Sequence, residues 1–277
     1  YTGATAVPFN VMLKAPEIAF ELRDCGAKVL IVHEVFAEEA AKAVRDDAVE
    51  LIVVEMAPVP TTPAHGSSWL GRMAAAQPMA EPYPTRPDDT AVMLYTTATS
   101  GYPLGAELTH FNLHQQSQTI THYVFAYSPD DVFLTALPLF HSFGLTTMLH
   151  APFQTRSAIV MVPRFDAGSV LAGIARYGIT LAAMVPTMFH LLTHYRPDTA
   201  FDVGSVREFI TGGAAMPHDL VATFYERFGM TILEGYGLTE TSPLVAFNRS
   251  QAINRPGSVG LPIWGCKVRS DAGPGAE

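Results

Sequence analysis

The first part of the chain alternates between short apolar runs and segments with helical periodicity. Residues 28–33 and 51–54 are compact apolar runs, rich in valine and isoleucine, of the kind that form buried strands. Residues 16–25 repeat apolar side chains on one helical face, and Gly26 is placed to end that helix. Residues 38–47 are rich in alanine and charge. This order of elements predicts a βαβ unit with a parallel sheet.

The alternation is interrupted once and then resumes. Residues 57–88 contain seven prolines, which predicts a linker or surface excursion with room for one short helix. Beyond it, Thr109 and Asp166 are placed to cap helices, and Gly178 to end the second of them. Pro217 suits the first position of a third helix. Apolar runs predict strands at 91–96, 132–137, 158–162, 180–185, 206–211 and 231–233, and helices at 110 into the 120s, 142–151, 167–178 and 217–228.

These elements predict an α/β fold made of βαβ subdomains with mostly parallel sheets. We divide the chain into residues 1–56, a partial first βαβ subdomain, residues 57–88, the proline-rich linker, and residues 89–277, a second α/β subdomain. No internal repeat or low-complexity tract interrupts this organisation.

Composition narrows the class of protein. The 277 residues include 17 basic and 26 acidic side chains, a formal charge of −9, and 48% are hydrophobic, which excludes intrinsic disorder. The acidic balance argues against a nucleic-acid-binding surface, which needs clustered lysine and arginine. Two cysteines, Cys25 and Cys266, are too few for a disulfide scaffold, so a reducing, cytoplasmic location is expected. The nearest approach to a membrane span, residues 179–192, is too short and carries Pro186 and His190.

A cluster of hydroxyl and glycine residues follows the strand predicted at 91–96. Hydroxyl groups and backbone N–H groups are what a loop needs to hold phosphate oxygens. Serine, threonine and glycine also fill ordinary strand-to-helix turns, so the cluster alone leaves both interpretations open. No lysine follows its last glycine, which distinguishes it from the common G-x-x-x-x-G-K-[ST] nucleotide loop. The candidate phosphate-binding residues are Thr96, Thr97, Thr99, Ser100, Gly101 and Gly105.

Residues 95–105 resemble the phosphate loop of the adenylate-forming enzymes, the superfamily of acyl-CoA synthetases, luciferases and nonribosomal adenylation domains. The family pattern Y-T-S-G-T-T-G-x-P-K-G is followed by L-T-H, and Leu108-Thr109-His110 stands at that spacing. Further segments match in the family's order: residues 137–144 resemble the loop beside the acyl pocket, 211–214 the adenine-contacting strand end, 235–241 the Y-G-x-T-E segment and 257–262 the G-S-V-G-x-P segment. Ordered motifs over most of the chain are far more specific than any single one.

The resemblance implies the large N-terminal domain of an adenylate-forming enzyme, closest to the fatty acyl-CoA ligases. In the family, a ribose-binding aspartate, a hinge and a C-terminal lid domain with a catalytic lysine would follow Glu277, and another segment would precede Tyr1. We therefore expect residues 89–277 to form the nucleotide- and acyl-binding subdomain of a truncated chain in which the lid domain is absent. Such a chain alone should complete neither half-reaction efficiently.

The resemblance also assigns roles to individual residues. It implies that the carboxylate of Glu240, after a predicted Gly-Tyr-Gly turn, holds Mg²⁺ bridging the ATP phosphates, and that Thr239 contacts the α-phosphate. Mg²⁺ prefers hard oxygen ligands and few protein carboxylates, which agrees with this role. His141 would orient the acyl carboxylate or gate the acyl tunnel. The residues implied to contact adenine are Gly212, Gly213, Ala214, Gly235, Tyr236 and Gly237.

Each of these residues also has an ordinary structural interpretation. Glu240 could be an acidic residue in the first turn of a helix, and Tyr236 a half-buried aromatic. A histidine after an apolar run, as His141 is, more often has a structural role. His190 and His194 have the i, i+4 spacing of metal ligands, but a third ligand and the glutamate of H-E-x-x-H are missing, which disfavours zinc. The absence of G-x-S-x-G disfavours a serine hydrolase.

The implied activity is that of an AMP-forming acid–thiol ligase, an acyl-CoA synthetase. A carboxylic acid would react with ATP to give an acyl-adenylate, and CoA would then displace AMP, so ATP, Mg²⁺ and CoA are expected. A fatty acid is favoured over an amino acid because no acidic residue is evident for binding an α-ammonium group. A homodimer is left open. The alternative is a non-catalytic nucleotide- or acyl-binding homologue, which ATP–pyrophosphate exchange over a panel of fatty and aryl acids would separate from an enzyme.

The phosphate loop departs from the family pattern at two chemically important positions. Ala98 stands in place of glycine, and its Cβ disfavours a backbone with positive φ. Leu104 stands in place of lysine, which removes the loop's only cation. We hypothesise that the loop is compromised as a phosphate site.

Restoring the cation tests this hypothesis. A hydrogen bond to a charged group contributes about 1.5–3 kcal/mol, so Leu104→Lys should raise ATP affinity by roughly one to two orders of magnitude. Titration of ATP into the two proteins measures the change, with Tyr102→Lys as the control for non-specific attraction. Unchanged ATP affinity and turnover in Leu104→Lys would show the hypothesis to be wrong.

Overall fold

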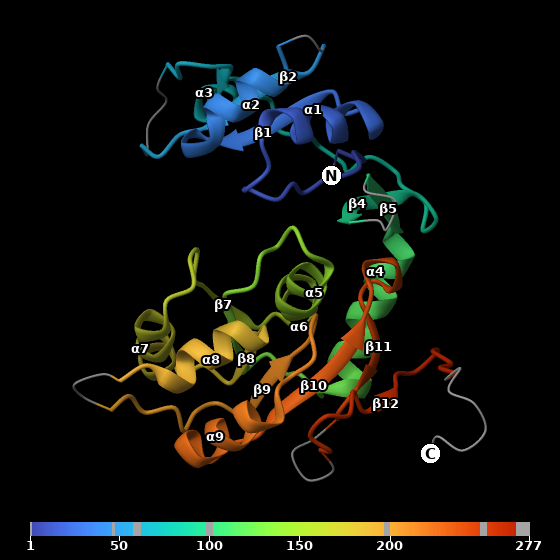
Figure 1. Cartoon of the computed structure of the whole chain (residues 1–277). Coiled ribbons are helices and arrows are strands. Elements are labelled where there is room, and N and C mark those ends of the chain that lie inside the picture. The colour runs from blue at the N-terminus through green and yellow to red at the C-terminus, as the bar shows by residue number, and fades with distance from the viewer. Residues whose placement is uncertain are drawn as a thin grey trace. The chain divides into compact units, whose positions relative to one another are not determined.

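The computed structural model describes residues 2–45, 48–57, 62–97, 102–196, 200–249 and 254–269. The chain divides into two compact units, Tyr1–Glu107 and Leu108–Glu277, and each is described by itself (Figure 1). Both units combine helices with parallel strands, which confirms the predicted α/β class. No helix in the described ranges is long and apolar enough to cross a membrane.

The elements of the first unit are α1 (Ala15–Asp24), β1 (Val29–His33), a 3₁₀ turn (Glu34–Phe36), α2 (Ala37–Ala43), β2 (Glu50–Val54), β3 (Ser67–Ser68), α3 (Trp69–Ala75), β4 (Thr90–Thr97) and β5 (Pro103–Thr109). The strands β1, β2 and β3 form a parallel sheet in that order. Small alanines of α2, Ala37 and Ala40, pack against Leu51 and Val53 of β2. The predicted βαβ unit is therefore present, and β4 and β5 form a separate two-stranded sheet.

One strand of this unit differs from the sequence prediction. Residues up to Gly105 were predicted to continue the phosphate loop, whereas β5 already begins at Pro103. A Cβ on Gly105 would lie 2.7 Å from the Sδ atom of Met93 on β4. Gly105 therefore makes room for the Met93 side chain on the neighbouring strand, and its expected part in phosphate binding stays a prediction.

The elements of the second unit are α4 (His110–Gln118), a π-helical segment (Thr119–Val124), β6 (Val132–Thr135), α5 (Ser142–Leu145), a second π-helical segment (Thr146–His150), α6 (Ala151–Thr155), β7 (Ala158–Met161), α7 (Ala167–Tyr177), β8 (Leu181–Met184), α8 (Pro186–His194), β9 (Glu208–Thr211), α9 (His218–Phe228), β10 (Ile232–Gly237), a 3₁₀ turn (Thr239–Thr241), β11 (Leu244–Phe247) and β12 (Leu261–Pro262). Its sheet has the order β12-β11-β10-β9-β8-β6-β7. The strands from β10 to β7 are parallel, and β11 and β12 are antiparallel additions.

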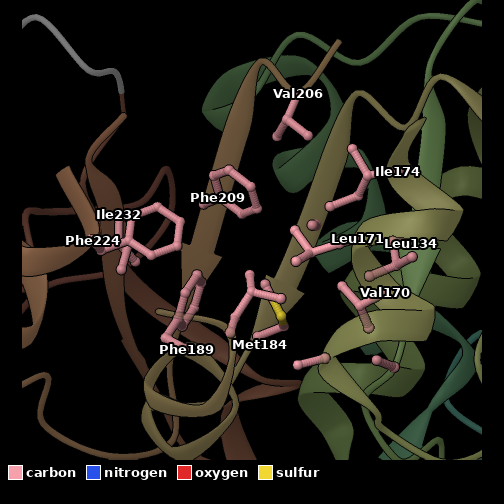
Figure 2. Close-up of a cluster of buried hydrophobic side chains, with 14 of the residues drawn as sticks. Leu134, Val170, Leu171, Ile174, Met184, Phe189, Val206, Phe209, Phe224 and Ile232 are labelled. Atoms are coloured by element: carbon pink, nitrogen blue, oxygen red, sulfur yellow. The ribbon is translucent and has the colours of Figure 1, made fainter. Parts of the chain in front are cut away.

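Alternate residues of the parallel strands face two helical layers. Leu134, Phe209 and Ile232 contact one layer, formed by α7, α8 and α9, and Figure 2 shows this cluster around Phe189 of α8 and Phe224 of α9. Their neighbours along the strands pack into a second core with the helices of residues 110–155. Burial on both faces explains why these strands read as continuous apolar runs rather than as alternating patterns.

The helix caps follow the sequence signals. The Thr109 hydroxyl accepts a hydrogen bond from Asn112 N at 3.1 Å, and the Asp166 carboxylate accepts one from Ser169 N at 2.7 Å. Gly178 ends α7 with φ of 62°, in the left-handed region that glycine adopts without strain. Pro217 differs slightly from its predicted place, because it precedes α9 as the capping residue in an extended conformation.

A charged cluster lies at the amino ends of the parallel strands. Arg207 Nη1 is 2.9 Å from Asp131 Oδ1, which also accepts a hydrogen bond from the Thr180 hydroxyl at 2.8 Å. Arg207 also forms a longer ion pair with Glu208, with 3.9 Å between Arg207 Nε and Glu208 Oε1. The other carboxylate oxygen of Glu208, Oε2, is buried and has no hydrogen-bond partner among the described residues. Burial, reinforced by nearby Asp131 and opposed by Arg207, raises the pKa of Glu208 to about 7.

Glu208 should therefore make stability depend on pH. Its folded-state pKa is raised, so the protonated form is favoured by folding, and the stability it contributes is present below pH 4.5 and is lost as pH rises through about 7. We expect Glu208→Gln to remove this loss, so that the variant gains stability over the parent between these pH values. Urea unfolding across that range measures the difference, with exposed Glu226→Gln as the control. A difference between Glu208→Gln and the parent that does not vary with pH would contradict the assignment.

Candidate active site

A cavity of about 330 Å³ lies in the second unit at the carboxyl ends of the parallel strands. Its walls come from the residues that follow β6, β8 and β9 and from the end of β10. The strand order reverses between β6 and β8, and open α/β sheets bind ligands outside the carboxyl ends of strands at such a switch point. Both the cavity and the topology therefore indicate a candidate ligand site at the carboxyl ends of these strands.

Three segments that the sequence singled out surround this cavity. Residues 137–144 supply Leu137, Pro138, His141, Ser142, Phe143 and Gly144, residues 211–214 supply Thr211, Gly212, Gly213 and Ala214, and residues 235–239 supply Gly235, Tyr236, Gly237, Leu238 and Thr239. These segments are far apart in sequence. The parallel sheet brings them together because each follows or ends a neighbouring strand.

The glycines of the third segment have a structural reason that the sequence did not reveal. Residues 235–237 were predicted to form a turn, but they are the last residues of β10. A Cβ on Gly235 would lie 2.1 Å from the Phe247 ring, and one on Gly237 would lie 2.1 Å from the Pro243 carbonyl oxygen. These glycines let β11 approach β10 closely, so the turn prediction was wrong. Tyr236 lies between them and is 46% exposed at the cavity.

His141 lies at the cavity wall, directly before α5. Its ring is tilted against Phe140, with 4.7 Å between the ring centroids. The surrounding protein removes part of its water, which lowers the pKa of His141 below the ordinary value and favours the neutral ring. A neutral imidazole at this place can donate or accept a hydrogen bond to a bound polar group.

The turn after β10 is held in place by two side chains. The Thr241 hydroxyl accepts a hydrogen bond from Leu238 N at 3.0 Å and so closes the turn on itself. Gln116 of α4 reaches across and donates from Nε2 to the carbonyl oxygens of Thr241 at 2.9 Å and Leu244 at 3.0 Å. Thr239, on this turn, lines the cavity. The geometry around Thr239 is therefore fixed by a distant helix, which no local sequence signal indicates.

Glu240 lies on the same turn and is exposed to solvent. Within the described ranges, the Glu240 carboxylate forms no hydrogen bond or ion pair. The same ranges contain no group of three or more aspartate, glutamate, histidine or cysteine side chains that could hold a metal ion. A single free carboxylate beside a cavity fits Mg²⁺, which keeps several waters and takes its other ligands from phosphates. The donor set does not fit a metal that needs a protein-built cage.

The candidate phosphate-loop residues belong to the first unit. Thr96 lies in β4, and its hydroxyl donates to the Leu104 carbonyl oxygen at 3.4 Å. Thr97 is the last residue of β4. Leu104 is 60% exposed at the start of β5. Ala98, Thr99, Ser100 and Gly101 lie outside the described residues.

Among the described residues, His190 and His194 of α8 are not part of a metal-binding group. The rings of His190 and His194 are 4.2 Å apart between centroids, and His194 Nδ1 lies 2.9 Å from the His190 carbonyl oxygen. No third side chain completes a metal-binding group with them in the part of the chain that the structure describes.

Several cavity residues were not found from the sequence. Val185 follows β8, while Pro243, Leu244 and Phe247 come from β11 and the segment before it. Val185 could have been found from the rule that parallel strands end at one edge. The β11 residues gave no such signal, because a strand of four residues after a glycine-rich segment does not stand out by periodicity.

Comparison with known proteins identifies a matching family and similar relatives. The sequence profile described as "AMP-binding enzyme" matches residues 1–272. Feruloyl-CoA synthase from Amycolatopsis sp is 31% identical over 276 residues, covering 99% of this chain and 52% of that protein. A long-chain-fatty-acid–CoA ligase from Bacillus subtilis (strain 168) is 25% identical, covering 95% of this chain and 51% of that protein. The chain thus spans about half the length of the curated relatives it matches.

A solved structure supports the same assignment of the fold. The N-terminal domain of FACL13 from Mycobacterium tuberculosis superimposes with a TM-score of 0.79 and 28% sequence identity, covering 95% of this chain and 64% of that chain. The prediction of an α/β N-terminal domain like that of the adenylate-forming enzymes is therefore confirmed.

The contacts of Gln116 give a prediction about the turn. Gln116→Ala removes two partly buried hydrogen bonds to the Thr241 and Leu244 carbonyl groups, so we expect a loss of about 1–3 kcal/mol in the free energy of unfolding. Hydrogen exchange at the amides of Leu238, Thr241 and Ser242 should also become faster. Gln118→Ala, at a half-buried glutamine of the same helix, is the matched control. Equal effects of the two variants on the stability and exchange of the turn would contradict the role of Gln116.

Proposed function

The chain belongs to the AMP-binding enzyme family, and on that basis we propose that it carries the nucleotide- and acyl-binding part of an AMP-forming acid–CoA ligase. The observation that carries this proposal is the cavity at the carboxyl ends of the strands, where residues 137–144, 211–214 and 235–239 converge. The relatives named as CoA ligases support the same class of reaction.

In the proposed reaction a carboxylate oxygen of the substrate attacks the α-phosphorus of ATP. The bond from this phosphorus to the oxygen that bridges to the β-phosphate breaks, and pyrophosphate leaves. The thiol sulfur of CoA then attacks the acyl carbonyl carbon, AMP leaves with its phosphate oxygen, and the thiol proton is released. The protein contributes position and charge stabilisation to both steps rather than a covalent intermediate.

The nucleotide is proposed to bind along the end of β10 and the segment after β9. The exposed face of Tyr236 offers a stacking surface for adenine, and Gly212, Gly213 and Ala214 offer backbone at the cavity wall. Gly213 has a φ of 82°, which a residue with a Cβ would adopt only with strain. Thr239 would contact the α-phosphate region, and the loop of Thr96, Thr97, Thr99, Ser100 and Gly101 the remaining phosphates.

Magnesium is proposed to be held by Glu240, because this carboxylate is exposed on the turn that also bears Thr239. When bound, Mg²⁺ would neutralise phosphate charge during pyrophosphate departure. The turn itself is rigidly positioned by Gln116 and Thr241, so the protein places the carboxylate before any ligand arrives.

The acid is proposed to be apolar. Among the described residues, no carboxylate or ammonium group lines the cavity, so the α-ammonium group of an amino acid would find no charged partner there. The walls contributed by Leu137, Phe143 and Val185 favour an aryl or alkyl chain, and neutral His141 could orient the carboxylate by a hydrogen bond.

Binding of acyl-sulfamoyl adenosines, stable analogues of the acyl-adenylate, tests this function. Calorimetric titration with aryl and alkyl analogues should detect binding of at least one, and Tyr236→Ala should weaken it by about two- to tenfold, since aromatic stacking contributes about 0.5–1.5 kcal/mol. Tyr225→Ala, at an exposed tyrosine of α9 that does not line the cavity, is the matched control. Failure of every analogue to bind, or equal binding by both tyrosine variants, would overturn the proposal.

A further inference from the structure

Tyr236, whose ring is the proposed stacking surface for adenine, lies in a stretch of β10 with little local restraint. Gly235 and Gly237 flank it, and glycine restricts the backbone less than any other residue. The pairing of β10 with β11 is irregular directly after Tyr236, where Val245 is an extra residue of β11. Such bulges redirect neighbouring side chains and are common beside functional sites. The direction of the Tyr236 ring therefore depends on contacts from other segments.

Asn248 holds the backbone immediately before this stretch. Its backbone N–H donates to the Glu234 carbonyl oxygen at 3.1 Å, and its side-chain Nδ2 donates to the same oxygen at 3.2 Å. Both lone pairs of that oxygen are thus used. Asn248 is only 4% exposed, so water does not compete for these bonds. Because a peptide unit is planar, fixing this oxygen also fixes the plane that joins Glu234 to Gly235.

Residues 257–263, the brace segment, bind both partners of this contact. The segment contains the G-S-V-G-x-P pattern, which has no part in the cavity described above. Asn248 Nδ2 also donates to the Ser258 carbonyl oxygen. The buried Glu234 carboxylate accepts a hydrogen bond from Gly257 N at 2.8 Å. The brace segment therefore holds Asn248 and Glu234 together from one side.

The chain beyond Tyr236 is held by the same brace segment. Ile263 N donates to the carbonyl oxygen of Val245, the extra residue of β11, at 2.9 Å. Ile263 is buried in the core that also contains Phe247 of β11, and β12 pairs with β11 along its edge (Figure 1). The brace segment thus fixes the backbone on both sides of Tyr236, before it through Asn248 and after it through the bulge.

The brace segment also packs closely behind the cavity wall. Gly260 has a φ of 81°, and a Cβ on it would lie 2.1 Å from the Phe247 carbonyl carbon and 2.3 Å from Asn248 N. Phe247 lines the cavity, and its ring occupies the space that a Cβ on Gly235 would need. Contacts therefore run without a break from the brace segment through β11 to the strand end that carries Tyr236.

We propose that Asn248 is a positioning residue for nucleotide binding, which directs the Tyr236 ring toward adenine by fixing the Glu234–Gly235 peptide against the brace segment. This inference rests on the proposed function, because it requires adenine to stack on Tyr236. Asn248 is not among the described residues that line the cavity, so its effect is exerted through Tyr236. A ring that is already oriented loses less conformational freedom when the ligand binds, which increases affinity.

Titration of the whole chain with the acyl-sulfamoyl adenosine that binds it best, followed by NMR of the adenine H2 and H8 protons, tests this role. Stacking on the face of Tyr236 should move these resonances upfield in the parent complex, and Tyr236→Ala should abolish the change. Asn248→Ala should reduce the upfield change even at saturating ligand. It should also weaken binding by about two- to tenfold, the range expected when stacking is lost.

A double-mutant cycle separates positioning from a general loss of stability. In the Tyr236→Ala background, Asn248→Ala should change the affinity by less than about twofold, because the ring that it directs is gone. Asn254→Ala is the matched control, since Asn254 Nδ2 donates to the Ile232 carbonyl oxygen at 3.2 Å, at the opposite end of β10. This control should leave the adenine resonances and the affinity as in the parent.

A second pair of variants guards against misfolding. Asn248→Asp keeps the shape of the side chain but cannot donate from it, and should act like Asn248→Ala. Glu234→Gln keeps an acceptor for Gly257 N and should act like the parent. Slow amide exchange in β8 reports that each variant is folded. If neither Asn248 variant is folded, the Nδ2 protons of Asn248 in the parent decide the question, because rapid exchange of these protons before ligand is added would contradict the proposal.

The outcomes separate this inference from the function on which it rests. Failure of the parent to bind any analogue would overturn the proposed function. Binding with an upfield change that Tyr236→Ala abolishes and Asn248→Ala leaves intact would overturn the positioning role alone. Equal losses of affinity from Asn248→Ala with and without the Tyr236 ring would also overturn it, because Asn248 would then act on stability and not through the ring.

Discussion

The common direction of β6, β8, β9 and β10 is the constraint on which the candidate site depends. Parallel strands cannot be joined by tight turns, so each is followed by a crossover that places helices on the two faces of the sheet. The carboxyl ends of the strands then open at one edge, which delivers His141, Gly212 and Tyr236 to one cavity although they are far apart in sequence. The reversal of strand order between β6 and β8 spreads the crossovers apart and leaves room for a ligand there.

The carboxyl and amino ends of these parallel strands carry different kinds of side chains. The carboxyl ends are lined by glycines, apolar side chains and a histidine whose pKa is lowered by burial, which would suit the acyl group and adenine proposed above. The amino edge holds the charged cluster of Asp131, Arg207 and Glu208, in which one guanidinium serves two carboxylates. Asp131 and Glu208 are buried while Arg207 is partly exposed, and their contacts link the amino ends of the strands whose other ends form the candidate site.

Much of the fold could be predicted because its elements are locally encoded. Runs such as Val29–His33 are apolar enough to be strands in any context, and capping side chains such as Thr109 and Asp166 mark helix starts by chemistry that acts within one turn. The segments of the site could be predicted by resemblance. What failed was the turn predicted at Gly235, because this residue lies in β10 and makes room there for Phe247 of β11. The link from Gln116 to the turn of Thr239 could not be predicted, because it joins residues 125 positions apart.

Segments distant in sequence are proposed to form one ligand site at the carboxyl ends of the parallel strands in the second unit. Its most direct test is to map backbone amide chemical shifts of the whole chain during titration with an acyl-sulfamoyl adenosine. The account predicts that the largest changes in the second unit fall together on residues 137–144, 211–214 and 235–241, with a single saturation curve. Changes in that unit confined to the amino edge around Asp131 and Glu208, or separate curves for the three segments, would contradict it.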